Sequence, residues 1–269
     1  MTGPDDPPGS LTFGGTATTL LRLGGFTLLT DPNFLHRGRR VHLGYGLTSR
    51  RRTEPALGPE DLPLLDGVLL SHLHGDHFDR IARDRLAPDL PVVTTPHAAR
   101  RLRRWGFEAA TGLQTWESRE IHRDGETLRV TAVPGQHGPA VVHRALPPVM
   151  GSVVDLERGG RRVLRVYVTG DTLRRPWLRS VRERFPDIDV MVAHLGGTRV
   201  LGVLVTMDGE QGADLASLID PGTTVPVHFD DYPVFRSPRS DFVARMAARG
   251  TGSRVLLVDR GGTVPLTAR

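Results

Sequence analysis

Short apolar runs alternate with glycine, proline and polar residues along the whole chain. Runs of strand length lie at residues 18–32, 67–72, 91–95, 128–135, 152–157, 165–171, 190–197, 223–228 and 254–259. Segments with the period of an amphipathic helix fall between them, at residues 77–87, 97–105, 176–185, 209–219 and 238–249. Strand runs interleaved with helical patterns are typical of sheets covered by helices. The pattern therefore predicts an α/β fold.

The distribution of glycine, proline and polar residues also predicts how the chain is divided into domains. Residues 1–10, MTGPDDPPGS, are predicted to form a flexible N-terminal tail. Residues 11–269 contain neither a low-complexity linker nor a short-period repeat, so we predict a single domain with ample chain to bury a core. Two strand-rich halves that meet near residue 150 would be consistent with an internally duplicated sandwich.

Composition excludes several classes of protein. No apolar run approaches the roughly 20 residues that a membrane-spanning helix needs, and the first residues lack the features of a signal peptide. We therefore expect a cytoplasmic protein that does not insert into membranes. The absence of cysteine removes disulfides, thiolate metal sites and cysteine nucleophiles, so any metal must be held by imidazole and carboxylate groups.

The net charge of +5 comes mainly from arginine runs at residues 36–40, 49–52, 98–104 and 174–179. Acidic residues interrupt these runs, and no aromatic stacking pattern accompanies them, which favours solvated surface over a nucleic-acid interface. Nucleic acid is therefore not an expected partner. The run Arg37–Arg40 is the best candidate for attracting an anionic small-molecule substrate. The oligomeric state cannot be read from the sequence.

The segment SHLHGDHFD, residues 71–79, concentrates potential metal ligands. It lies between a predicted buried strand and a predicted helix, so its ligands fall in the turn after a strand end. His72 and His74 point the same way, while Gly75 permits a sharp turn that sends Asp76 and His77 elsewhere. With this composition the H-x-H-x-D-H pattern arises by chance in about one in a thousand such chains. One loop could therefore serve two adjacent metals.

Further potential ligands follow other predicted strands. His137 comes after LRVTAVPGQ, Asp171 after RVYVTG and His228 after TTVPV. Each alone could be an ordinary polar loop residue. Together with the loop at 72–77 they complete a set of three histidines and a second set of Asp, His, Asp and His.

These motifs, taken in order, resemble those of the metallo-β-lactamase-fold hydrolases. TDP (30–32), HLHGDH (72–77), His137, GD (170–171) and His228 carry the resemblance over nearly the whole chain. The segments TDPNF, PGQHGP, YVTGDT, TMDGEQGA and VPVHFDDY are more similar to the branch with the ascorbate-6-phosphate lactonases and N-acyl-phosphatidylethanolamine phospholipase D-like proteins. The resemblance implies a four-layer αββα sandwich with two similar strand-rich halves.

The resemblance also implies a division of the ligands between two divalent metals. One metal is held by His72, His74 and His137, the other by Asp76, His77 and His228, and Asp171 bridges them. Paired cations would lower the pKa of a shared water toward neutrality, giving a hydroxide that attacks carbon or phosphorus. Asp76 and Asp171 are the predicted catalytic residues, since Asp76 can orient that hydroxide or shuttle its proton. Zinc is the first choice, but manganese and iron also accept such ligands.

Other residues have two interpretations each. Asp31 could accept a hydrogen bond from a ligand imidazole, as the family motif implies, or be a plain turn aspartate. His194 and Tyr232 are candidates to line the substrate pocket, although capping or buried hydrogen bonding would equally explain polar residues after His228. Asp208 could cap a helix near an anion or simply cap it. Five further histidines, which receive no role, are His36, His42, His97, His122 and His143.

The sequence thus predicts a dinuclear metal-dependent hydrolase that cleaves a small, anionic ester, lactone or phosphodiester. A lipid or nucleotide phosphodiesterase is the alternative among enzymes. A metal-dependent binding or oxidoreductive protein is the alternative of another class, because the same ligands can hold iron.

Overall fold

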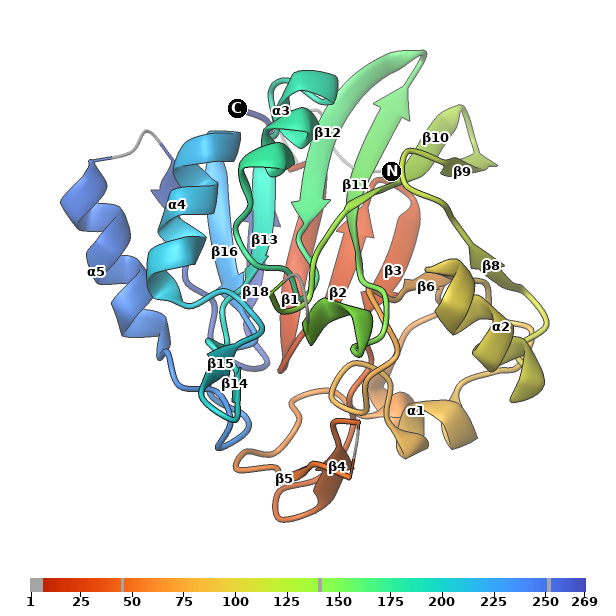
Figure 1. Ribbon diagram of the computed structural model, residues 1–269. Helices are drawn as coiled ribbons and strands as arrows, with labels where there is room; N and C mark the ends of the chain where they lie inside the picture. The colour runs from red at the N-terminus through yellow and green to blue at the C-terminus, as the bar shows by residue number, and fades with distance from the viewer. Residues whose placement is uncertain (1–6, 45, 140–141, 251–252) are drawn as a thin grey trace.

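Two mixed seven-stranded sheets form the centre of the structure, a computed structural model that describes residues 7–44, 46–139, 142–250 and 253–269 (Figure 1). The first sheet has the spatial order β18 (Thr263–Leu266), β1 (Gly9–Gly15), β2 (Thr18–Leu23), β3 (Phe26–Thr30), β6 (Gly67–Leu69), β7 (Val92–Thr94) and β8 (Ala110–Gly112). The second has the order β17 (Arg254–Val255), β16 (Thr223–Val227), β13 (Val190–His194), β12 (Arg161–Val168), β11 (Met150–Arg158), β10 (Glu126–Pro134) and β9 (Ser118–Arg123).

The sheets are parallel in one half and antiparallel in the other. In the first sheet β3, β6, β7 and β8 run parallel, and in the second sheet β12, β13, β16 and β17 do so. Strands covered on both faces read as unbroken apolar runs, as in VMVAH of β13. Val190 and Val192 face the core between the sheets, whereas Met191 and Ala193 face the outer helices. This alternation builds three apolar layers.

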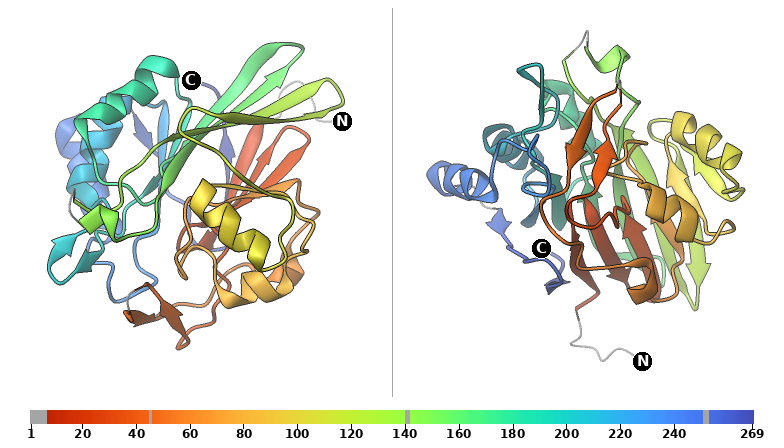
Figure 2. Two further views of the ribbon diagram at one scale, coloured as in Figure 1. Left: turned by 45° about the vertical axis from the view of Figure 1, so that its right-hand side comes forward. Right: turned by 90° about the horizontal axis from the view of Figure 1, so that it is seen from below.

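Helices cover both outer faces, as the two views of Figure 2 show. Those on the first sheet are α1 (Arg80–Arg85) and α2 (Pro96–Arg104); those on the second are α3 (Arg179–Arg184), α4 (Gly209–Ile219) and α5 (Arg239–Arg249). Asp79, Thr95 and Asp208 cap α1, α2 and α4 by accepting a backbone N–H of the first turn. The four-layer αββα sandwich predicted from the sequence is therefore confirmed.

Short elements fill the connections. They are the pair β4 (Arg40–His42) and β5 (Thr48–Arg50), the pair β14 (Arg199–Val200) and β15 (Val203–Leu204), and the 3₁₀ turns η1 (Pro59–Asp61), η2 (Val142–Arg144) and η3 (Pro176–Leu178).

Two predicted boundaries need correction. The halves do not meet near residue 150, because β9, β10 and β11 form one antiparallel meander in the second sheet. The division falls between β8 and β9, and β18 returns to the first sheet. The predicted tail, residues 1–10, overlaps β1, because Gly9 pairs with Leu23 on one side and Leu266 on the other. Residues 1–6 lie outside the described residues.

A buried ion pair ties together two loops that follow strands of different sheets. Arg51 is fully buried, and its Nη1 donates to the backbone oxygens of Asn33 and Leu35 at 3.0 and 2.9 Å. Its Nη2 lies 3.2 Å from Oδ1 of Asp231, whose Oδ2 accepts the N–H of Thr16 at 2.8 Å. The loop after β3 and the loop after β16 are thereby fixed relative to each other.

We expect Arg51→Met to lower the free energy of unfolding by about 3 kcal/mol or more, because it removes the fully buried cation that pairs with Asp231 and leaves two backbone carbonyls without their donor. Arg182→Met is the matched control, since Arg182 pairs with Asp220 at the surface and its loss should cost less than about 1 kcal/mol. Urea unfolding followed by circular dichroism measures both. Equal losses in the two variants would contradict the role given to Arg51.

Candidate metal centre

The predicted ligands gather at one end of the sandwich, where parallel strands have their carboxyl ends. Asp31 follows β3, His72 follows β6, Asp171 follows β12 and His228 follows β16. Carboxyl ends of parallel strands meet at one edge of a sheet, which is where α/β folds form their sites. All seven predicted ligands are buried. His228 has φ +61°, a left-handed conformation that is uncommon outside glycine and recurs at functional sites.

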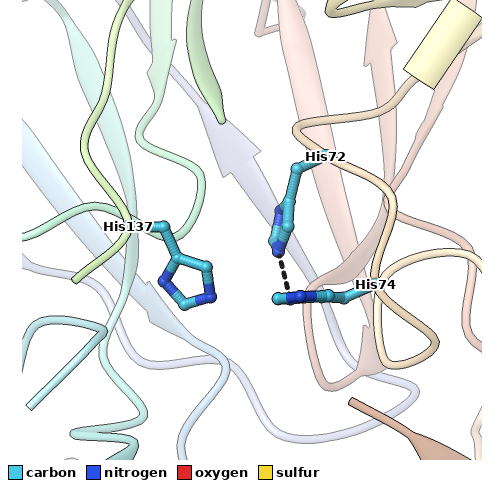
Figure 3. Close-up of side chains that lie close together, drawn as sticks. All are labelled: His72, His74 and His137. Atoms are coloured by element: carbon cyan, nitrogen blue, oxygen red, sulfur yellow. Dashed lines mark hydrogen bonds between the residues drawn. The ribbon is translucent and has the colours of Figure 1, made fainter. Parts of the chain in front are cut away.

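The first group of ligands is His72, His74 and His137, whose rings turn toward one another in Figure 3. Nε2 of His72 lies 2.9 Å from Nδ1 of His74. The ring centroid of His137 lies 5.2 Å from that of each of the other two. The outer nitrogen of His137 is 2.8 Å from the carbonyl of Val205, and that of His72 is 3.0 Å from Oγ of Ser71. These contacts aim Nε2 of both rings inward.

The second group is Asp76, His77 and His228. Oδ2 of Asp76 lies 3.4 Å from Nε2 of His228 and 4.0 Å from Nε2 of His77. The rings of His77 and His228 are 4.9 Å apart. The ligand atoms of these three residues all lie within 4.8 Å of one another. One carboxylate and two imidazoles this close could hold a divalent cation such as zinc.

Asp171 lies between the two groups. Its Oδ2 is 3.4 Å from Nε2 of His77, and its Oδ1 is 3.6 Å from Nδ1 of His228. It also forms a potential ligand set with His72 and His77, one from each group. The hydroxyl of Thr206 donates to Oδ2 at 3.0 Å and fixes this side chain.

Several buried atoms at this point have no hydrogen-bond partner within the described part of the chain. They include Oδ1 of Asp76, Oδ1 of Asp171, Nε2 of His77 and both ring nitrogens of His228. A buried polar atom without a partner costs free energy, and carboxylate oxygens require a positive partner. These nitrogen and oxygen atoms are of the kinds that bind divalent metals, and they lie close enough together to share a cation.

The electrostatics of the centre also favour positive charge. Burial lowers the pKa of His72 well below its usual value, and it lowers that of His74 to about 4, so both rings are neutral and can act as ligands. Burial opposes protonation of His77 too, but the carboxylates of Asp171, Asp31 and Asp76 outweigh it and raise its pKa. In the absence of metal, His77 supplies the charge that these carboxylates need.

Asp31 supports the centre from behind. Its Oδ2 lies 3.1 Å from Nδ1 of His77 and 3.3 Å from Nε2 of His194, and its Oδ1 accepts the N–H of Ser71 at 2.7 Å. Burial raises the pKa of Asp31, but the charge of His77 and the hydrogen bonds from His194 and His77 lower it to about 2. Asp31 therefore stays ionised and orients a ring of the second group.

The structure places both predicted pocket residues inside the protein. His194 is fully buried, with Nδ1 3.2 Å from Oγ1 of Thr169. Tyr232 is fully buried too, and its hydroxyl donates to Oδ1 of Asn33 at 3.2 Å. Neither lines the cavity beside the ligands. Asp231, the residue before Tyr232, serves the tether to Arg51 instead.

A cavity of about 900 Å³ opens beside the first group, and His74 and His137 form part of its wall. His42, His97 and His143, for which no role was expected, also line it. The run Arg37–Arg40 does not; the arginines that line it are Arg101 on α2 and Arg144 on η2. His36 and His122 lie elsewhere, beside Glu54 and Glu120.

Sequence reasoning missed three contributors to the centre. Thr206 and Val205 come from the segment before α4 and hold Asp171 and His137. Their role depends on a contact across more than 30 residues of chain, so no local pattern reveals it. Ser71 adjoins His72, and its hydroxyl lies 2.9 Å from Oδ2 of Asp31. Its place in SHLHGDH was the one available signal.

No helix in the described ranges is long and apolar enough to cross a membrane.

Comparisons with known proteins identify the family of the chain. A family model described as "Beta-lactamase superfamily domain" matches residues 27–229. A metal-dependent hydrolase of Nanoarchaeum equitans is 24% identical over 200 residues, which cover 74% of this chain and 86% of that protein. An N-acyl-phosphatidylethanolamine-hydrolyzing phospholipase D of Caenorhabditis elegans is 30% identical over 135 residues, 47% of this chain and 37% of that protein.

The fold is shared with a solved structure as well. The isothiocyanate hydrolase from Delia radicum gut bacteria superposes with a TM-score of 0.77 at 24% identity, over 97% of this chain and all of that one. The resemblance inferred from the motifs is confirmed. Because the family model spans more than half of the sequence, the chain belongs to the beta-lactamase superfamily domain family, and it is a metal-dependent hydrolase of that fold.

Proposed function

We propose that this protein is a dinuclear metal-dependent hydrolase that cleaves a small, anionic ester, lactone or phosphodiester. The observation that carries the proposal is the position of Asp171 between two potential ligand groups, with contacts to His77 and His228 and a shared set with His72. A carboxylate has two oxygens and can serve two cations at once, whereas an imidazole nitrogen serves one.

The proposed ligands are His72, His74 and His137 for one cation, Asp76, His77 and His228 for the other, with Asp171 shared. When bound, two divalent cations would lower the pKa of a shared water and polarise the carbonyl or phosphoryl oxygen of the substrate. Zinc suits a donor set of imidazoles and carboxylates, and manganese or iron would also be accepted.

The chain's own residues supply orientation and proton transfer. Asp76 has one oxygen near His228 and one without a partner, so it can accept a proton from the nucleophile and hold it in line. Thr206 keeps Asp171 fixed, and Asp31 keeps His77 fixed. Burial of all these groups excludes bulk water and makes each charge act more strongly.

Two features bear on the substrate. Arginines in the cavity wall favour an anion. The phospholipase D of Caenorhabditis elegans, which matches about half of the chain, makes a lipid phosphodiester the alternative substrate. The cytoplasmic location stays a prediction.

We expect purified protein equilibrated with zinc to hold about two ions per chain, and His72→Ala to lower that content by at least half, because it removes a ligand. His122→Ala is the control, since this exposed histidine lies on β9 beside Glu120. Mass spectrometry of the metal after dialysis measures both. Full metal content in His72→Ala would contradict the assignment.

We expect Asp171→Asn to lower kcat/KM by about 100-fold or more while the far-ultraviolet circular dichroism stays unchanged, because the shared carboxylate is lost and the side chain keeps its shape. Asp84→Asn, which alters an exposed ion pair with Arg83, should retain wild-type activity. A 4-nitrophenyl ester, a lactone and bis(4-nitrophenyl) phosphate, each assayed with and without chelator, form the substrate panel. Turnover of none of the three, with both metals bound, would overturn the hydrolytic proposal for these substrate classes.

A further inference from the structure

We propose that the cavity beside the metal centre selects substrates with two parts, an apolar body and a separate anionic group held by Arg101 and Arg144. The inference rests on the proposed function, because it takes this cavity to be where the substrate is held. Arg101 and Arg144 would then determine which anionic substrates the enzyme prefers.

The charge of the cavity wall is one-sided. Arg101 and Arg144 are among the side chains that line it, and His97 and His143 lie beside them, while none of the described lining residues is an aspartate or glutamate. In the described part of the chain neither arginine is ion-paired to a carboxylate. An uncompensated pair of guanidinium groups beside a site attracts anions and can bind carboxylate or phosphate in a fork geometry.

Several other arginines of this protein are paired with carboxylates. Arg83 on α1 pairs with Asp84 at 2.8 Å, and Arg129 on β10 pairs with Glu120 at 2.6 Å. Among the described residues many other arginines have no such partner, and what sets Arg101 and Arg144 apart from those is that they line the cavity. A cation that has no carboxylate partner and lines a cavity therefore has its charge available to a ligand.

Arg101 is also held in place. Its guanidinium carbon lies 5.3 Å from the ring centroid of Trp105, which itself lines the cavity. Stacking on an indole restrains the side chain but leaves the N–H groups of the guanidinium free to donate. Arg144 comes from η2, in the connection between β10 and β11, so the two charges reach the cavity from different elements.

A large part of the remaining wall is apolar, although Gln136 and His42 also line it. Phe78 and Trp105 contribute aromatic surface, and Leu146, Pro147 and Val149 contribute aliphatic surface. This apolar surface gains free energy from burying hydrocarbon, which a fully polar molecule such as a free sugar phosphate does not supply. The combination fits an acyl or aryl compound that carries a carboxylate, sulfonate or phosphate.

Turnover of a matched pair of esters tests this selection. The 4-nitrophenyl monoester of adipic acid and 4-nitrophenyl hexanoate differ only in a carboxylate that replaces a methyl group. We expect the ratio of their kcat/KM values, adipate over hexanoate, to fall by roughly fivefold to tenfold in Arg101→Met and in Arg144→Met, mainly through KM. Arg100→Met is the matched control, because this exposed arginine of α2 does not line the cavity and should keep the wild-type ratio.

A binding measurement separates this inference from the proposed function. Octane-1-sulfonate carries an apolar chain and an anion that is a poor metal ligand, and methyl octyl sulfone is its neutral counterpart. By calorimetry we expect the wild type to bind the sulfonate more tightly, and the preference to fall in Arg101→Met and Arg144→Met but not in Arg100→Met.

The outcomes differ between the two ideas. If neither ester is cleaved but the sulfonate preference depends on Arg101 and Arg144, the hydrolytic proposal for esters fails and the ligand class holds. If the sulfonate binds no better than the sulfone, or if both arginine variants keep the wild-type preference, the inference is overturned whatever the turnover.

Discussion

Three carboxylates buried in one pocket, those of Asp31, Asp76 and Asp171, set the constraint on which this end of the molecule depends. Buried negative charge costs several kcal/mol per group unless a positive partner is close. His77 is that partner, with ring nitrogens 3.1 Å from Asp31, 3.4 Å from Asp171 and 4.0 Å from Asp76. One imidazolium cannot balance three carboxylates, and among the described residues Oδ1 of Asp76 and Oδ1 of Asp171 have no hydrogen-bond partner. The demand for cations is therefore built into the fold.

The sandwich brings the carboxylates and the histidines together because the carboxyl ends of the parallel strands of both sheets lie at the same end of the molecule. The first sheet brings Asp31 and the 72–77 loop, and the second brings Asp171 and His228. Apolar packing between the two sheets is not directional, so by itself it does not fix the loops of one sheet relative to the loops of the other. The buried pair between Arg51 and Asp231 fixes them directly, since it joins the loop after Asp31 to the loop after His228. Buried charged groups thus have two roles in this protein: those of the metal centre are potential ligands, and the Arg51–Asp231 pair holds two loops together.

The sequence predicts this centre better than it predicts the cavity beside it, for a physical reason. Ligands follow strand ends, and strand ends can be read from local apolar periodicity, which is how His137 and Asp171 were identified among many polar loop residues. The wall depends on which distant segments happen to face one another. Arg101 sits in a helix whose sequence resembles any solvated helix, and the run at Arg37–Arg40 is equally basic but lies elsewhere. Tyr232 does not line the cavity either: its ring packs 5.5 Å from that of Phe235 and its hydroxyl donates to Asn33, a partner 199 residues away in sequence.

The proposed ligands and the cavity wall share His74 and His137 but otherwise come from different segments. The ligands follow strand ends, where a shift of one residue would turn a ligand away. Much of the remaining wall comes from α2 and from residues 143–149, which contribute no proposed ligand. Substitutions there can change which substrate is held without disturbing the donors. We therefore expect the substrate preference proposed for Arg101 and Arg144 to change on substitution of these residues while the metal ligands stay in place.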